Sequence, residues 1–168
     1  MRAEIKRFDD AIDRALDRVR SPAVDGVVYR LSSSADHSLL WHAAGAATAL
    51  ARGGDVKFAT RFAVAMGAES LLTNGVVKQM FGRLRPREYA DIEFHHGLHK
   101  PITSSFPSGH ATAAFCAATL LGGGPGWYAL ATGVAATRVY VRLHHASDVA
   151  AGAAFGVALG VAFRRFVR

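Results

Sequence analysis

The chain has 168 residues, which is enough for one domain with a hydrophobic core of its own. Hydrophobic side chains make up 51% of it and the formal net charge is +7, so a membrane-like composition is combined with a basic balance. The basic residues are dispersed between apolar runs and no nucleic-acid module is visible, so we expect no nucleic-acid partner. The single cysteine, Cys116, excludes an internal disulfide and is expected to be a buried packing residue.

The first twenty residues predict an amphipathic helix. Apolar side chains recur there at helical spacing, at Ile5, Phe8, Ile12, Ala15, Leu16 and Val19. We expect residues 1–20 to lie at a membrane interface with the apolar face down; a helix packed on its own domain is the alternative. Ser21-Pro22 is expected to end this helix, and residues 21–36 to form a polar connection. The sequence after Met1 has no apolar h-region, which predicts no cleaved signal peptide.

Five apolar stretches follow the connection. They are residues 38–51, 58–77, 107–121, 127–143 and 148–163. A spanning helix needs roughly 20 residues for a hydrocarbon core of ~30 Å, and several stretches are shorter, so the buried helices of a soluble bundle are an alternative. The fold class that we predict is all-α. It is an integral membrane bundle of about five spans, with a helical core at 38–163 in a single membrane domain, 1–168.

The pattern of charges and glycines favours the membrane. No charged residue occurs between Lys100 and Arg138. The stretch 148–163 is apolar all round and is followed at once by Arg164-Arg165, where a soluble surface helix would show a polar face. Glycines recur every four residues in this stretch, at Gly152, Gly156 and Gly160. Such a repeat lets helices approach closely in a membrane, whereas it would lower helix stability in water.

Three polar clusters stand at the ends of the apolar stretches. They are Lys78 to Pro86, then Pro107-Ser108-Gly109-His110, and then Thr137-Arg138 with His144 and Asp148. Together they supply the cations of Lys78, Arg85 and Arg138, a glycine turn that opens a helix, two imidazoles and a carboxylate. These are the groups that binding and transferring a phosphate requires. The alternatives are an ordinary helix start at the second cluster and interfacial anchoring for the basic residues.

The third cluster contains a candidate dyad. Asp148 lies four residues after His144, so on a helix the two side chains share a face. A carboxylate that fixes one imidazole nitrogen leaves the other unprotonated, as a nucleophile or a base requires. His145 lies three residues before Asp148 and is also compatible with contact, so spacing alone does not choose between the two histidines. Arg138 interrupts an apolar run and needs an anionic partner if it is buried.

These clusters resemble the signature of the type 2 phosphatidic acid phosphatase superfamily, which also contains bacterial acid phosphatases and vanadium haloperoxidases. The family motifs read K-x6-R-P, P-S-G-H and S-R-x5-H-x3-D. The matching residues are Lys78, Arg85 and Pro86, then Pro107, Ser108, Gly109 and His110, and then Arg138, His144 and Asp148. Thr137 stands in the serine position and keeps a hydroxyl group. Three ordered motifs over about seventy residues form a highly specific signal.

The resemblance implies a role for each matched residue. His144 would attack phosphorus and become a phosphohistidine, Asp148 would orient it, and His110 would protonate the leaving oxygen and then activate water. The equatorial phosphate oxygens would be held by Lys78, Arg85, Arg138, the Ser108 hydroxyl and the Gly109 amide. The resemblance implies no metal and no cofactor, and it puts His145 out of register.

Several other polar residues have open roles. His95, His96 and His99 in the long polar segment 82–106 are compatible with a metal site, although we do not expect one. The segment 87–103 is a candidate lid. The remaining candidates for the cavity or for contacts between helices are Glu69, Asn74, His37 and His42.

The charge distribution predicts the membrane face of the site. Joining the three clusters places 14 of the 20 Lys and Arg residues on the side of the site, which predicts a cytoplasmic active site in the cell membrane. Similarity to the short actinobacterial family members then favours a polyprenyl-linked phosphomonoester as substrate, with decaprenylphosphoryl-5-phosphoribose from arabinan precursor synthesis as the first choice. The alternatives are undecaprenyl pyrophosphate, phosphatidylglycerol phosphate and phosphatidic acid. Membrane lipids are the other expected partners, and a homo-oligomer stays open.

Three rival classes remain at this stage. A vanadium haloperoxidase would share the pocket but is expected to be larger and soluble. A soluble acid phosphatase would normally carry a secretory signal. A membrane or nucleic-acid-binding protein without enzymatic activity would have no use for the three motifs.

Overall fold

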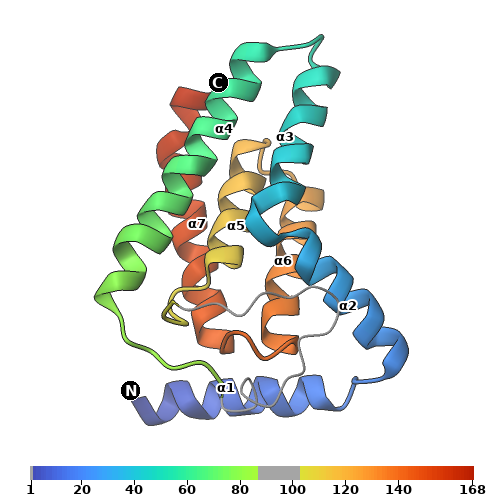
Figure 1. The fold of residues 1–168 in the computed structure, drawn as a ribbon, viewed down its shortest axis with the longest axis vertical. Coiled ribbons are helices and arrows are strands. Elements are labelled where there is room, and N and C mark those ends of the chain that lie inside the picture. The colour runs from blue at the N-terminus through green and yellow to red at the C-terminus, as the bar shows by residue number, and fades with distance from the viewer. Residues whose placement is uncertain (1, 87–102) are drawn as a thin grey trace.

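The computed structural model describes residues 2–86 and 103–168, except the side chain of His37. These residues fold into helices, drawn in chain order in Figure 1. They are α1 (Arg2–Asp17), α2 (Pro22–Ser34), the short 3₁₀ helix η1 (Asp36–Ser38), α3 (Leu39–Ala51), α4 (Val56–Ser70), the π-helix η2 (Leu71–Val76), the 3₁₀ helix η3 (Val77–Met80), α5 (Gly109–Leu120), α6 (Pro125–Tyr140) and α7 (Ala146–Val167). The prediction of an all-α fold is confirmed for the described residues.

Each of the five predicted apolar stretches is a helix. The second stretch continues through η2 and η3 as far as Met80, so it forms one helical column of mixed geometry. Among the described residues, α7 alone is long and apolar enough to cross a membrane by itself, and α3 is a shorter apolar helix. Large apolar side chains are exposed on several of these helices, as at Leu50, Val64, Leu71 and Val161. The number of helices that cross a bilayer stays a prediction.

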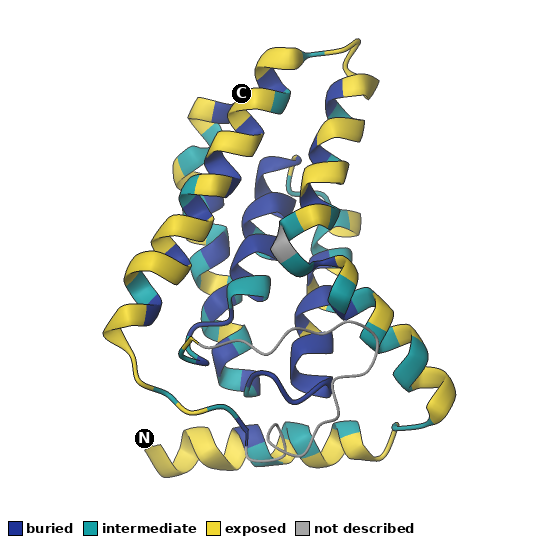
Figure 2. Ribbon diagram, in the orientation of Figure 1, coloured by how far each residue is buried: buried dark blue, intermediate teal, exposed yellow. Residues whose placement is uncertain are grey.

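Helix α5 forms the centre of the bundle. It is buried along nearly its whole length, with α7, α6 and α4 packed around it (Figure 2). Its side chains are mostly small, and nine of its twelve residues are buried, including Cys116, as predicted. Such small side chains allow the neighbouring helices to lie close to its backbone.

The glycine repeat of α7 lies against α5. A Cβ atom on Gly156 would lie 2.3 Å from the Thr112 carbonyl oxygen, and one on Gly152 would lie 2.6 Å from the Ser108 carbonyl oxygen. On Gly160 it would lie 2.6 Å from the Thr119 Cβ atom. The predicted close approach of helices is therefore confirmed, and α5 is the helix that the glycines approach.

The N-terminal region differs from the prediction in one element. Residues 21–36 were predicted to form a polar connection, which is wrong because most of them form α2 and η1. Ser21 caps α2 by accepting a hydrogen bond from the Val24 amide, and Pro22 occupies the first turn, where its missing N–H costs nothing. Ser21-Pro22 therefore follows one helix and starts the next.

Helix α1 lies across one end of the bundle (Figure 1). Its ion pairs show that the acidic side of the helix faces the bundle. Asp9 is buried, and both Asp13 and Asp17 pair with Arg142. The apolar residues Ile5, Phe8 and Val19 are exposed instead. A helix is present at Arg2–Asp17, and it packs on its own domain through these carboxylates and through Leu16. Its position at a membrane interface stays a prediction.

The glycine contact predicts the effect of adding a single methyl group. In Gly156→Ala the new Cβ would meet the backbone of α5, which cannot rotate away as a side chain can, so we expect a loss of about 2 kcal/mol or more in the free energy of unfolding. Gly133→Ala in α6 is the control, since nothing lies within 4 Å of its Cβ position. Thermal unfolding in detergent measures both, and equal midpoints for the two variants would contradict the packing argument.

Candidate active site

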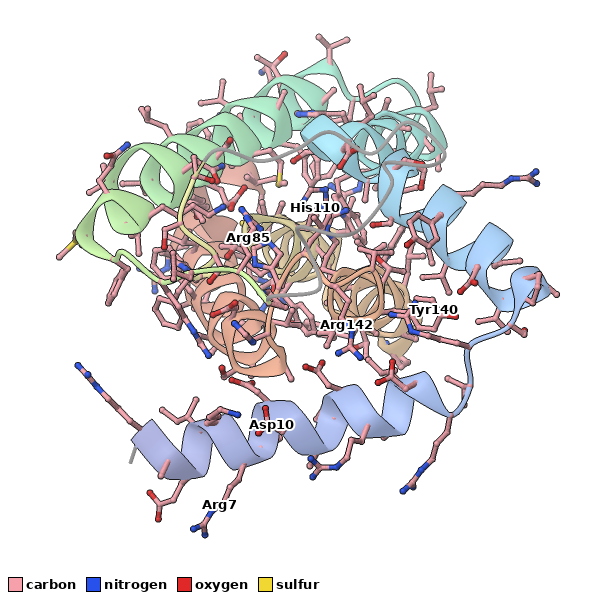
Figure 3. The ribbon with its side chains drawn as sticks, turned by 60° about the horizontal axis from the view of Figure 1, so that its bottom comes forward. Arg7, Asp10, Arg85, His110, Tyr140 and Arg142 are labelled. Carbon is pink, nitrogen blue, oxygen red and sulfur yellow. The ribbon has the colours of Figure 1, made fainter. Side chains whose placement is uncertain are left out.

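The three clusters of the sequence meet at one end of the bundle. The last turn of the α4 column, the starts of α5 and α7 and the end of α6 all lie at the end that α1 crosses (Figure 1). A cavity of about 500 Å³ opens there. The matched motif residues that line it are Lys78, Arg85, Gly109, His110, Arg138 and His144. Figure 3 shows Arg85 and His110 pointing into the space that the helices enclose.

His144 is held in a defined orientation. Its Nδ1 atom lies 2.7 Å from the Ser105 carbonyl oxygen, and since a carbonyl only accepts, Nδ1 carries the hydrogen. The unprotonated Nε2 atom accepts a hydrogen bond from Arg85 Nη1 at 3.4 Å. Burial, together with the positive charges of Arg85, Arg138 and Lys78, lowers the pKa of His144 to about 3. The imidazole is therefore neutral near pH 7, with an unprotonated nitrogen beside a cation.

The relation of Asp148 to His144 differs in detail from the predicted helical pair. His144 precedes α7, whose N-cap is His145, so the two residues do not share a helix. Asp148 Oδ2 lies 3.8 Å from His144 Nδ1, which is within reach of an ion pair and beyond a hydrogen bond. The Ser105 carbonyl, which the sequence analysis missed, makes the direct contact.

Asp148 is itself part of a buried ionic cluster. Arg83 donates hydrogen bonds from Nη1 to Asp148 Oδ1 at 2.7 Å and from Nη2 to Asp9 Oδ2 at 2.8 Å. Asp9 also accepts from the amide of Ser147 at 2.8 Å and from its hydroxyl at 2.9 Å. Since Asp9 belongs to α1, this cluster ties the N-terminal helix to the carboxylate beside His144. Arg83 lies in the first sequence cluster, but the motif does not include it.

Three cations surround the cavity. Arg85 donates to the carbonyl oxygens of Leu143, at 2.5 Å, and Thr103, at 3.1 Å, which fixes its guanidinium beside His144. Lys78 is 7% exposed, and its Nζ lies 3.4 Å from Thr103 Oγ1. Burial and the charges of Arg85 and Arg138 lower the pKa of Lys78 to about 8. Such mutual repulsion is what a site prepared for a multiply charged anion shows.

The backbone at the start of α5 lies at the wall of the cavity. Ser108 caps the helix and is fully buried, and its amide donates to the Asp148 carbonyl oxygen at 3.0 Å. Gly109 lines the cavity beside Asn74 and Lys78. The free amides of this helix start can bind an anion, whereas the Ser108 hydroxyl is engaged in capping. Its predicted contact with phosphate stays a prediction.

A second group of residues reaches the cavity from the N-terminal segment. Arg138 Nη1 contacts Ser32, through both the carbonyl oxygen and Oγ, and lies 3.7 Å from Asp36 Oδ1. The same Asp36 oxygen lies 2.8 Å from His110 Nε2. Asp36 is therefore the anionic partner that the buried Arg138 requires. No motif points to Ser32 or Asp36, since both fall in the segment that was predicted to be a connection.

The other polar residues named as candidates differ in whether they line the cavity. His42, Glu69 and Asn74 line the cavity. His145 is not among the lining residues; its Nε2 lies 3.3 Å from the Leu84 carbonyl oxygen, and its amide donates to Asp148 Oδ2 at 2.9 Å at the start of α7. The side chain of His37, the histidines His95, His96 and His99, and nearly all of the candidate lid 87–103 lie outside the described residues. Within the described parts of the chain, no group of three or more His, Cys, Asp or Glu side chains is arranged to hold a metal ion.

Comparison with known proteins agrees with this geometry. A sequence model of the PAP2 superfamily matches residues 58–168. A decaprenylphosphoryl-5-phosphoribose phosphatase of Mycolicibacterium smegmatis is 35% identical over 158 residues, which cover 89% of this chain and 84% of that protein. A lipid A 1-phosphatase of Porphyromonas gingivalis is 37% identical over 94 residues, which cover 49% of this chain and 18% of that protein.

The fold also matches a solved structure. The transmembrane PAP2-type phosphatidylglycerolphosphate phosphatase of Bacillus subtilis superimposes with a TM-score of 0.74 at 24% identity, over 97% of this chain and 86% of that one. The chain therefore belongs to the PAP2 superfamily, as the three motifs predicted. It is a phosphatase, a phosphoric monoester hydrolase, and the transmembrane neighbour supports a location in the membrane.

The lowered pKa of Lys78 predicts an alkaline limit to activity. Lys78 is charged below pH 8 and loses its proton above it, so kcat/KM should fall as the pH rises through about 8 and one cation disappears from the site. Lys78→Arg keeps its charge over this range, and its alkaline limb should move upward by at least about one pH unit. A pH profile with 4-nitrophenyl phosphate tests this, and an unchanged limb in the variant would contradict the assignment.

Proposed function

We propose that this phosphatase hydrolyses a lipid-linked phosphomonoester through a phosphohistidine at His144. The observation that carries the proposal is the orientation of His144, whose Nδ1 hydrogen is held by the Ser105 carbonyl and whose unprotonated Nε2 lies beside Arg85. A nucleophile needs an unprotonated nitrogen directed at the place where the phosphate is held, and the three cations mark that place.

The first step transfers the phosphoryl group to the enzyme. Lys78, Arg85 and Arg138 bind the phosphate oxygens, and the Nε2 lone pair of His144 attacks phosphorus. The bond from phosphorus to the ester oxygen breaks, and His110 donates a proton to that oxygen, which leaves as an alcohol. The imidazole becomes positively charged and keeps its Nδ1 hydrogen, and Asp148, at 3.8 Å, offsets the new charge.

The second step returns the enzyme to its starting state. His110, now neutral, takes a proton from a water molecule while the water oxygen attacks phosphorus. The bond between phosphorus and His144 Nε2 breaks, the imidazole regains its lone pair and inorganic phosphate forms. The two products are therefore an alcohol and phosphate.

We further propose decaprenylphosphoryl-5-phosphoribose as the substrate. The support is the relative of that name in Mycolicibacterium smegmatis, which this chain matches over most of both lengths. A cavity of about 500 Å³ is larger than a phosphate group needs, and polar residues on α3, α4 and η2 line it beside the cations. This leaves room for a hydroxylated headgroup that carries the phosphate.

The proposed location is the cell membrane, crossed by about five helices, with the active site on the cytoplasmic face. The apolar outer surfaces of α3, α4 and α7 and the excess of basic residues at the end with the site support it. An Arg7→Cys variant, with its new thiol on the outer side of α1 at that end (Figure 3), tests the face by labelling with a membrane-impermeant thiol reagent. We expect labelling only after the cells are lysed, and labelling in intact cells would reverse the assignment.

Replacing the nucleophile tests the chemistry. His144→Ala should lower kcat by at least about 1,000-fold, because no other group of the site can form the covalent intermediate. His145→Ala is the matched control, since this neighbour does not line the cavity, and it should stay within about 5-fold of wild type. Phosphate release in detergent measures both variants. Near-normal activity of His144→Ala, or an equal loss in both, would refute the role of His144.

A substrate panel tests the choice of lipid. Purified enzyme should release phosphate from decaprenylphosphoryl-5-phosphoribose at least about 10-fold faster than from undecaprenyl pyrophosphate, phosphatidylglycerol phosphate or phosphatidic acid, because its headgroup offers the most hydroxyl groups to the polar wall of the cavity. The reaction should proceed in EDTA, since the proposed steps use no metal. Preference for another lipid would overturn the substrate, and a strict need for Mg²⁺ would overturn the mechanism.

A further inference from the structure

Asp36 is a carboxylate in the cavity that no family motif contains. It belongs to η1, a three-residue turn between α2 and α3, and the next helix starts from Ser38 at a left-handed φ of 58°. The chain turns sharply here between α2 and α3, and Asp36 lies at the turn, in the wall of the cavity. A non-glycine residue in a left-handed conformation costs free energy and persists only where the surroundings require it.

The carboxylate of Asp36 contacts His110, the proposed leaving-group acid, and lies near Arg138. Its Oδ1 atom lies 2.8 Å from His110 Nε2 and 3.7 Å from Arg138 Nη1. An ionised carboxylate only accepts hydrogen bonds, so His110 Nε2 carries a hydrogen and donates it. Among residues 2–86 and 103–168, the structure gives the other nitrogen, Nδ1, no hydrogen-bond partner, and His110 lines the cavity.

The charges around His110 make this contact important. A leaving-group acid must carry a proton, yet burial and the cations Arg138 and Lys78, which face His110 from α6 and η3, disfavour a positive charge on the ring. Asp36 is the negative group at hydrogen-bond distance from the ring, and it opposes these effects. Arg138 is held at hydrogen-bond distance by Ser32, whereas Asp36 lies 3.7 Å away, so the position of this phosphate-binding cation depends on Ser32 more than on Asp36.

We propose that Asp36 is the positioning residue of the leaving-group acid: it accepts the Nε2 hydrogen of His110 and directs Nδ1 to the ester oxygen. This rests on the proposed function. The imidazolium of His110 donates its Nδ1 proton to the leaving oxygen as the bond to phosphorus breaks, and the neutral ring keeps its Nε2 hydrogen on Asp36. In the second step Nδ1 takes a proton from water and restores the imidazolium. The site is thereby suited to esters of alcohols, which are poor leaving groups.

Two phosphate esters of similar size separate this role from a structural one. Benzyl phosphate releases an alcohol that needs a proton, whereas 4-nitrophenyl phosphate releases a stabilised phenolate that needs none. The value of kcat/KM reports the first step, in which the leaving group departs. Loss of an acid should therefore lower kcat/KM for the benzyl ester alone, while loss of phosphate binding or of folding lowers both.

The variants follow from the contacts. Asp36→Asn keeps a hydrogen-bond acceptor and removes the charge, and it should lower kcat/KM for benzyl phosphate about 100-fold and for 4-nitrophenyl phosphate by less than about 5-fold. Asp36→Glu restores the carboxylate, and its kcat/KM for benzyl phosphate should be at least about 10-fold higher than that of Asp36→Asn. Asp25→Asn on α2 is the control, because that carboxylate contacts the Tyr140 hydroxyl instead, and it should leave the ratio of the two esters unchanged.

The outcomes separate the two proposals. If hydrolysis of both esters does not depend on His144, the proposed function fails and the role of Asp36 fails with it. If hydrolysis depends on His144 but Asp36→Asn lowers both esters equally, the role of Asp36 alone is overturned. Higher activity in Asp36→Asn would also overturn it, since the carboxylate would then be a blocking anion.

Discussion

The close packing of α7 on α5 is the constraint on which the site depends. Gly152 and Gly156 allow the two backbones to approach to a distance that no side chain would permit. This approach brings the starts of both helices together, and the Ser108 amide donates to the Asp148 carbonyl oxygen. His110 follows at once on one helix and His144 precedes the other, so a single interface sets both imidazoles at the same cavity.

The N-terminal segment completes this arrangement electrostatically. A site for phosphate concentrates positive charge, and buried cations need anionic partners. Apart from Asp148 on Arg83, those partners come from the first 36 residues, with Asp9 on Arg83, Asp13 and Asp17 on Arg142, and Asp36 near Arg138. The acidic side of α1 therefore faces inward, and the apolar side chains of Ile5 and Phe8 are left exposed, as is expected for a helix at a bilayer surface.

The features that could be predicted from the sequence are those that short-range patterns of residues encode. The apolar runs gave the five helices, the glycine repeat gave the close interface, and the motif spacing gave Lys78, Arg85, His110, Arg138 and His144, all of which line the cavity. Contacts between distant segments leave no such pattern. The contacts of Asp36 and Ser105 at the site, and the ionic cluster of Arg83, Asp148 and Asp9, were therefore not predicted. Helix α2 was missed for a local reason, because a Ser-Pro pair is compatible with both the end and the start of a helix.

The covalent intermediate is the central claim, and trapping it is the most direct test. The His110→Ala variant with ³²P-labelled 4-nitrophenyl phosphate should accumulate it, because the leaving group needs no acid but the attack by water lacks its base. After an alkaline quench, the account predicts a label that is stable in base, labile in acid and located on His144. A label on another residue, or none when 4-nitrophenol is released in a burst, would contradict the account.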